Sequence, residues 1–240
     1  MTPQPSDQEF LQAIFGVAAP FAHVTSFPDD PSAIVDRGRC WGGGWFKDTH
    51  IDPRNNNYFT ISIFEQPRRR KDYFIATHLI VADDVSEKIP VENANLLPPP
   101  TYKLQSSNGS EQWGWVLDTP CYDRGMVENL LNGLIVQGLA PAGVDPGMKG
   151  VTRYIRLPNS KNTKASRVAE NGGIPPAVHL TEWHPERKTS IEFLAAPFNI
   201  DIHAPVRKES DSKAIDLPDH PMIEMINKGV VHVKEKLGPG

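Results

Sequence analysis

Two strand-like segments separated by a short cationic connection constrain the fold of this chain more than any other feature. In residues 58–64 the side chains alternate with a period of two, and residues 73–81 form a nearly continuous run of β-branched and aromatic residues. Such patterns are typical of strands inside a sheet. The connection indicates either a solvated hairpin turn or a site for a phosphate backbone. Its four consecutive cations are Arg68, Arg69, Arg70 and Lys71.

Further patterns along the chain predict an α+β fold. Ser6 and Glu9 have the spacing of a capping box at the start of a short N-terminal helix, and a second helix is predicted from Asp123 to Gly138. Strands that precede and follow a helix in this order are typical of α+β proteins. The other expected elements are a long surface segment over 28–57, strands over 112–117, 151–157 and 178–183, a loop after Asn162, a short helix from Ser190 and a last helix over 219–228.

The composition excludes several classes of protein. The 23 prolines in 240 residues mostly stand singly between patterned segments, which indicates turns rather than a disordered tail. No apolar run approaches the roughly 18 residues of a membrane span, and no signal peptide is evident, so we expect a cytoplasmic protein with no membrane partner. Cys40 and Cys121 suit neither a disulfide framework nor a paired zinc site. A net charge of −4 requires that any cations for nucleic acid be concentrated in one place.

Acidic residues mark the first candidate site. Asp83 and Asp84 directly follow the apolar run of the second strand, where buried carboxylates are costly unless a cation or hydrogen bonds compensate them. Asp145 stands in a short loop before the segment that carries Arg153 and Arg156. If these segments are neighbours in the sheet, carboxylates that ligate Mg²⁺ or Mn²⁺ lie beside guanidiniums that neutralise a triphosphate. The alternative is that the acids only cap turns.

Two polar stretches offer hydrogen-bond donors to a nucleotide. Residues 106–110 (SSNGS) bring hydroxyl and backbone N–H groups close to Gln112, although they are equally typical of a hairpin turn. Residues 156–164 (RLPNSKNTK) are dense in donors to phosphate and ribose oxygens. The nucleotide-binding candidates are Ser107, Asn108, Gln112, Arg153, Arg156, Lys161 and Asn162.

The order of these segments resembles the RepB-like DNA primases of phages and mobile elements, a branch of the archaeo-eukaryotic primase, or primase-polymerase, superfamily. The likeness covers roughly residues 20–190 and rests on SFPDDP, DPRNNNYFTISIF, RRRK, THLIVADDV, YKLQSSNGSEQWGWVL, VDPGMKGVTRYIRLPNSKN and LTEWHPER. The resemblance implies a primase-polymerase core with a mostly antiparallel sheet, similar to the RNA-recognition fold and flanked by helices and long loops. On this basis we expect a catalytic domain over 1–205 and a linker with a short helix over 206–240 that leads to further modules.

The resemblance implies a nucleotidyltransferase that makes or extends primers on single-stranded DNA from nucleoside triphosphates by two-metal phosphoryl transfer. Asp83, Asp84 and Asp145 would hold two Mg²⁺ or Mn²⁺ ions, the seven nucleotide-binding candidates would hold the triphosphate, and residues 68–71 the template backbone. The family further implies phage or mobile-element replication, with a helicase module in the same or a neighbouring chain as a partner.

Two departures from the family pattern leave an alternative open. The family often separates its first two acids by one residue, whereas Asp83 and Asp84 are adjacent, and an extended strand sends adjacent side chains to opposite faces. Either one metal ligand is missing here, or a bent backbone supplies it. The family's second motif often holds Ser-x-His, and here Ser110 or Gln112 replaces its hydrogen bond but not its charge. The alternatives are a catalytically degenerate replication-initiation or single-stranded-DNA-binding module and a purely structural domain.

Overall fold

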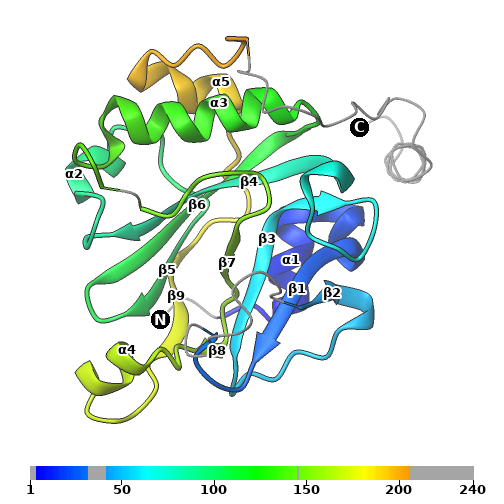
Figure 1. The fold of residues 1–240 in the computed structure, drawn as a ribbon, viewed down its shortest axis with the longest axis vertical. Helices are drawn as coiled ribbons and strands as arrows, with labels where there is room; N and C mark the ends of the chain where they lie inside the picture. The colour runs from blue at the N-terminus through cyan, green and yellow to red at the C-terminus, as the bar shows by residue number, and fades with distance from the viewer. Residues whose placement is uncertain (1–3, 32–41, 145, 206–240) are drawn as a thin grey trace.

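The computed structural model describes residues 4–31, 42–144 and 146–205, and within them it confirms an α+β fold with a mostly antiparallel sheet (Figure 1). Nine strands follow the order β2-β1-β3-β4-β6-β5-β9-β8, with β7 paired to β3 beside this path. The strands are β1 (Ala22–Phe27), β2 (Gly44–Trp45), β3 (Asn56–Phe64), β4 (Phe74–Val85), β5 (Tyr102–Ser107), β6 (Ser110–Cys121), β7 (Tyr154–Arg156), β8 (Ser160–Lys161) and β9 (Ala177–Trp183).

Helices cover parts of this sheet. Phe10 of α1 packs on the rings of Phe59, Tyr102 and Trp183, which belong to three different strands. The helix α3 lies along β4 and β6, with α5 beside it (Figure 1). None of the helices in the described residues is long and apolar enough to cross a lipid bilayer. The helices are α1 (Asp7–Phe15), α2 (Val91–Ala94), α3 (Arg124–Leu134), α4 (Ala165–Glu170) and α5 (Ile191–Ala195). Shorter helical turns are η1 (Gly16–Phe21), η4 (Phe46–Asp48), η5 (Lys71–Tyr73), η6 (Ile135–Leu139) and η7 (Ala196–Phe198).

Local chemistry sets the helix ends where the sequence placed them. The Ser6 hydroxyl accepts the N–H of Glu9, and the Glu9 carboxylate accepts the N–H of Ser6, which completes the predicted capping box. Asp123 caps α3 by accepting two backbone N–H groups. The turn η6 that continues α3 contains Gly138 at φ +114°, a conformation that ends the helix where we predicted.

Several predicted elements are confirmed and others are corrected. The strands over 58–64 and 73–81 pair antiparallel as β3 and β4, and those over 112–117 and 178–183 belong to β6 and β9. The surface segment over 28–57 contains β2, η4 and the first residues of β3. The strand expected over 151–157 is only the three residues of β7, because residues 150–152 form a turn. Residues 40 and 219–228 lie outside the described part of the chain.

Three of the elements that the sequence analysis did not predict, β5, β8 and α4, were missed for identifiable reasons. The strand β5 ends in the serine-rich stretch that indicated only a turn, and β8 has two residues, too few to show a period. The helix α4, in the expected loop after Asn162, has no buried residue and so shows no apolar stripe. These elements are short or exposed, and their positions depend on contacts with the rest of the sheet.

The sheet divides along β3, and we call this division the fork. Residues 62–64 of β3 pair with β4, and the hydroxyls of Ser62 and Thr77 hydrogen-bond at 2.7 Å there. Residues 58–60 of β3 pair instead with β7, while β4 continues alongside β6. The end of β4 and the strand β7 therefore face each other across the fork (Figure 1).

Candidate active site

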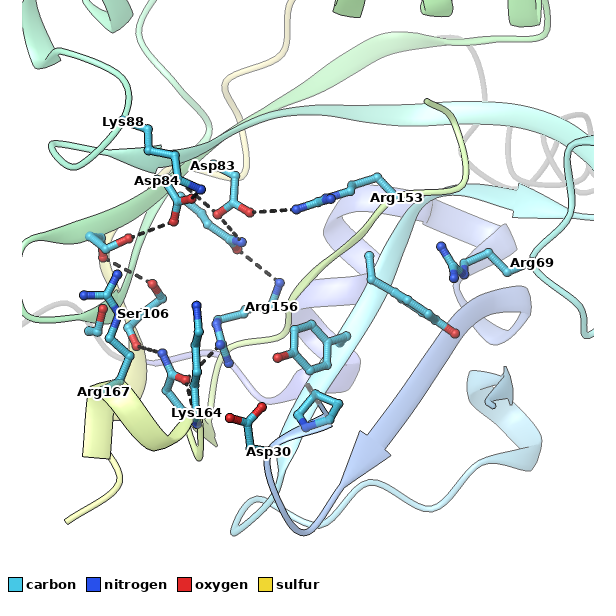
Figure 2. Close-up of a pocket in the computed structure, with 17 residues that line it drawn as sticks. Asp30, Arg69, Asp83, Asp84, Lys88, Ser106, Arg153, Arg156, Lys164 and Arg167 are labelled. Carbon is cyan, nitrogen blue, oxygen red and sulfur yellow. Dashed lines mark hydrogen bonds and ion pairs between the residues drawn. The ribbon is translucent and has the colours of Figure 1, made fainter. Parts of the chain in front are cut away.

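A polar pocket of about 470 Å³ opens at the fork (Figure 2). Six cationic side chains and three carboxylates line it, so the pocket suits an anionic ligand better than a neutral one. The charged residues are Arg69, Lys88, Arg153, Arg156, Lys164 and Arg167 with Asp30, Asp83 and Asp84. The remaining lining residues are Pro31, Tyr58, Ser106, Ser107, Ser110, Gln112, Tyr154 and Asn162.

A β-bulge near the end of β4 places both adjacent acids at the pocket wall. The register between β4 and β6 shifts after Ala82, so that Asp83 and Asp84 together lie opposite Gln112. Asp84 has φ +56°, the left-handed conformation that aspartate adopts more readily than most residues. The bulge is thus the bent backbone that the sequence analysis left open as one of two alternatives, and Figure 2 shows both carboxylates on the same side.

Asp83 lies between a buried amide and a guanidinium. Its Oδ1 accepts a hydrogen bond from Gln112 Nε2 at 2.8 Å, and its Oδ2 lies 3.6 Å from Arg153 Nη2. Burial raises the pKa of Asp83, and the neighbouring charge of Asp84 raises it further. An additional cation near these oxygens would relieve this repulsion.

Asp84 is held by the turn that follows it. Its backbone carbonyl accepts the N–H groups of Glu87, Lys88 and Ile89, which closes a tight turn after β4. The turn places Lys88 Nζ 2.6 Å from Asp84 Oδ2, and this contact raises the pKa of Lys88. The other oxygen, Oδ1, accepts from the Ser110 hydroxyl at 3.2 Å.

Arg156 is fixed on the opposite side of the pocket. Its Nη1 donates to Asn56 Oδ1 at 2.7 Å and its Nη2 to Asn162 Oδ1 at 2.9 Å. The guanidinium carbon also lies 5.0 Å from the ring centroid of Tyr58. Asn162 in turn donates to the carbonyl oxygen of Ser106 at 2.9 Å. The guanidinium is therefore oriented before any ligand binds.

Arg167 links α4 to the turn after β4. It pairs with Glu170 on its own helix at 2.9 Å and with Glu87 on that turn. Both carboxylates raise the pKa of Arg167, and the Glu87 hydrogen bond has the larger effect. The first backbone N–H of α4, that of Ala165, donates to Asp30 at 3.0 Å. These contacts close one end of the pocket.

The pocket gathers part of the predicted nucleotide-binding set. Its lining includes Ser107, Gln112, Arg153, Arg156 and Asn162. Within the described residues, the buried Ser107 hydroxyl has no hydrogen-bond partner and is available to a ligand. The structure does not place the remaining candidates at the pocket: Asn108 is exposed in the β5–β6 turn, Lys161 lies in β8, and the predicted metal ligand Asp145 is outside the described residues.

The four predicted template-binding cations divide in the structure. Arg69 lines the pocket, where it donates to the Thr152 carbonyl oxygen at 2.6 Å and stacks 4.2 Å from the Tyr154 ring centroid. The other three lie outside the pocket: Arg68 is exposed, Arg70 pairs with Asp72, and Lys71 pairs with Glu128. Their contact with a template stays a prediction.

Sequence reasoning missed some lining residues. Lys88 stands four residues after Asp84, and this spacing alone could have indicated the ion pair. Arg167, Tyr58 and Asp30 carried no local signal, because their place at the pocket depends on how distant segments meet. Lys164 belonged to the donor-rich stretch but was not among the chosen residues.

The acidic side of the pocket fits a divalent cation. Asp83 and Asp84 offer hard oxygen ligands on the same wall of the pocket, and burial, together with the neighbouring charge of Asp84, raises the pKa of Asp83. No group of three His, Cys, Asp or Glu residues forms a metal cage among the residues that the structure describes. Mg²⁺ is commonly held by one or two carboxylates and completed by substrate phosphates, so two acids are sufficient for such a site.

Comparisons with known proteins agree on the fold. No protein-family model matches this chain, and no curated protein matches its sequence. The structure is similar to the AEP domain of the primase-polymerase of cyanophage S-2L, with a TM-score of 0.53 and 13% identity over 81% of this chain and 98% of that one. The chain therefore has the fold of an AEP domain, as the resemblance of its sequence to the RepB-like primases implied.

Two further solved structures are more distant. A crystal structure of primase RepB' gives a TM-score of 0.40 and 14% identity over 75% of this chain and 51% of that one. The catalytic domain of primase RepB' in complex with initiator DNA gives a TM-score of 0.44 and 16% identity over 78% of this chain and 92% of that one.

Proposed function

We propose that this chain is a primase-polymerase catalytic domain, a nucleotidyltransferase that makes or extends primers on single-stranded DNA from nucleoside triphosphates. One observation carries the proposal: on a fold shared with a protein named as a primase-polymerase, a bulged strand presents two adjacent carboxylates to a pocket lined by six cations. Mg²⁺ or Mn²⁺, held by Asp83, Asp84 and the predicted third ligand Asp145, would neutralise phosphate charge and lower the pKa of the attacking 3′-hydroxyl.

The basic side of the pocket suits the triphosphate of the incoming nucleotide. Arg153 lies beside Asp83, Arg156 lies across the pocket from the acids, and Lys164 and Arg167 line the pocket beyond Arg156 (Figure 2). Guanidiniums bind phosphate oxygens through paired N–H groups, and a preoriented guanidinium such as that of Arg156 loses little entropy on binding. The unpartnered Ser107 hydroxyl adds a neutral donor.

The cationic connection between β3 and β4 suits the template. Arg69 lies at the pocket, while Arg68 and Arg70 are exposed in the same connection. A run of cations that starts at the site of nucleotide addition and continues to the surface can follow a phosphate backbone without reading its sequence. In this proposal the catalytic domain spans residues 1–205, and a helicase module in the same or a neighbouring chain supplies single-stranded template.

Primer synthesis tests the proposal directly. The chain is incubated with single-stranded template, mixed nucleotides and Mn²⁺, and we expect extension products from the parent and none from Asp145→Ala. The control Asp118→Ala changes an exposed carboxylate of β6 outside the pocket and should keep the parental rate. Circular dichroism confirms that both variants fold. Parental synthesis by Asp145→Ala contradicts the site assignment, and retarded template without products favours the binding module instead.

A further inference from the structure

Gln112 joins the two sides of the fork. Among the described strands β7 pairs only with β3, and the backbone N–H of Arg156 is directed away from β3 toward the fork. The Gln112 side chain, from β6, reaches this N–H and accepts it through Oε1 at 3.1 Å. Its Nε2 donates to Asp83 Oδ1 at 2.8 Å. One amide therefore connects the strand that carries the acids to the strand that carries Arg156.

These two partners determine the orientation of the Gln112 amide. A backbone N–H can only donate, and an ionised carboxylate can only accept, so a flipped amide would set donor against donor and acceptor against acceptor. Gln112 is only 2% exposed, so bulk water does not compete for either bond. The amide is thus held in one orientation by the backbone of β7 and the side chain of Asp83.

We propose that Gln112 is a positioning residue: it orients the Asp83 carboxylate and sets Arg156 at a defined place relative to it. The reaction it serves rests on the proposed function, whereas its contacts do not. The Arg156 guanidinium is anchored elsewhere by Asn56 and Asn162, so Gln112 supplies the link between this anchored cation and the acid. The sequence analysis predicted a direct nucleotide contact for Gln112. Nucleotide binding and positioning differ in their effects on KM and kcat.

Kinetics separate positioning from nucleotide binding. Gln112→Met preserves the length of the side chain and removes both hydrogen bonds. We expect kcat for primer extension to fall by about tenfold to a hundredfold, the range found when partners that orient active-site ligands are removed. The KM for nucleotide should stay within about threefold of the parent, because ground-state contacts are kept. The matched control Gln105→Met, on β5 outside the pocket, should change neither value.

Two readouts need no polymerase activity. Isothermal titration calorimetry should show weaker Mn²⁺ binding by Gln112→Met than by the parent. Hydrogen exchange should show that the Arg156 backbone amide of the variant exchanges faster, while the protection of residues 62–64 is unchanged. A parent that makes no primers overturns the proposed function, but weaker Mn²⁺ binding with faster Arg156 exchange in the variant still supports positioning. The positioning proposal is overturned if Gln112→Met keeps the parental kcat and the parental exchange rate of the Arg156 amide. It is also overturned if the variant raises the KM for nucleotide at the parental kcat.

A second variant covers a failure to fold. If Gln112→Met is unfolded, Gln112→His is measured, since a neutral imidazole also carries one donor and one acceptor. Retained kcat together with a protected Arg156 amide supports the proposal. An unprotected Arg156 amide at parental kcat overturns it, because rate and strand position would then be independent of each other.

Discussion

Asp83 and Asp84, the acidic wall of the pocket, belong to one of two twelve-residue strands that pair along most of their length. The basic wall, formed by Arg153, Arg156, Lys164 and Arg167, lies on a three-residue strand, on a six-residue helix and in the loops beside them. Backbone pairing with β6 fixes the acids, whereas side-chain contacts hold Arg156 and Arg167. The acids and the Arg156 guanidinium are therefore both held in place before a ligand binds, by backbone pairing on one wall and by side-chain contacts on the other.

The acidic wall also carries unfavourable energy in the folded state. The pKa of Asp83 is raised by burial and by the charge of Asp84, so ionised Asp83 destabilises the fold at neutral pH. In the basic wall, Arg156 has two asparagine acceptors and Arg167 two carboxylates. The acids are therefore present at a cost to stability, which is typical of residues kept for chemistry.

The largest expected effect comes from neutralising the acidic wall. Asp83→Asn should lower primer extension by about a thousandfold, because a ligand of the proposed metal site and its charge are lost. The same variant should raise the melting temperature by about 2–4 °C, the shift that roughly 1 kcal/mol gives in a domain of this size. Extension assays and thermal unfolding of one preparation measure both effects.

The pH dependence of stability tests whether the raised pKa of Asp83 destabilises the fold. When the pKa of an acid is higher in the folded than in the unfolded protein, the folded state binds more protons between the two pKa values. The protein therefore loses stability as the pH rises from the ordinary pKa of the acid through its folded-state pKa. The parent should show this loss, and Asp83→Asn should lack it. Asp118→Asn, which changes an exposed acid of β6, should behave as the parent does. A destabilised Asp83→Asn would show that Asp83 is a structural residue.

A smaller effect is expected in the basic wall. Arg156→Lys keeps the charge but loses the fork geometry that reaches Asn56 and Asn162 together. Hydrogen bonds to charged groups contribute about 1.5–3 kcal/mol, so the KM for nucleotide should rise by about tenfold to a hundredfold. The control is Arg54→Lys, an exposed arginine paired with Asp52. Steady-state primer extension measures both, and an unchanged KM would remove Arg156 from the nucleotide site.

The difference between the long strands of the acidic wall and the short elements of the basic wall explains which features the sequence predicted. Strands β3 and β4 are buried along most of their length, so their residue pattern alone indicated them, and the acids at the end of β4 followed from it. The bulge was not predictable in the same way. The left-handed backbone of Asp84 arises from the register with β6 and from the turn closed by Lys88, which are tertiary features.

Only part of the basic wall was predicted from the sequence, and it was predicted as single residues and not as a surface. Arg153, Arg156 and Asn162 were chosen because donors cluster there, and all three line the pocket. Lys161 belonged to the same cluster, yet it lies in β8 and does not line the pocket. Arg167 reaches the pocket only because α4 meets the turn after β4.

The smallest expected effect concerns this last contact between the two walls. Glu87→Gln removes the carboxylate that ties Arg167 to the turn after β4, and Glu170→Gln, the matched control, removes the carboxylate that Arg167 meets within α4. Partly exposed ion pairs contribute about 0.2–1 kcal/mol, so amide exchange in α4 should quicken by at most about fivefold in Glu87→Gln.

The release of Arg167 should also lower the KM for nucleotide, because the guanidinium no longer has to leave Glu87. Glu170→Gln leaves the link across the pocket intact and should keep the parental KM. Equal changes in both variants would mean that Arg167 stabilises its own helix and does not connect the walls.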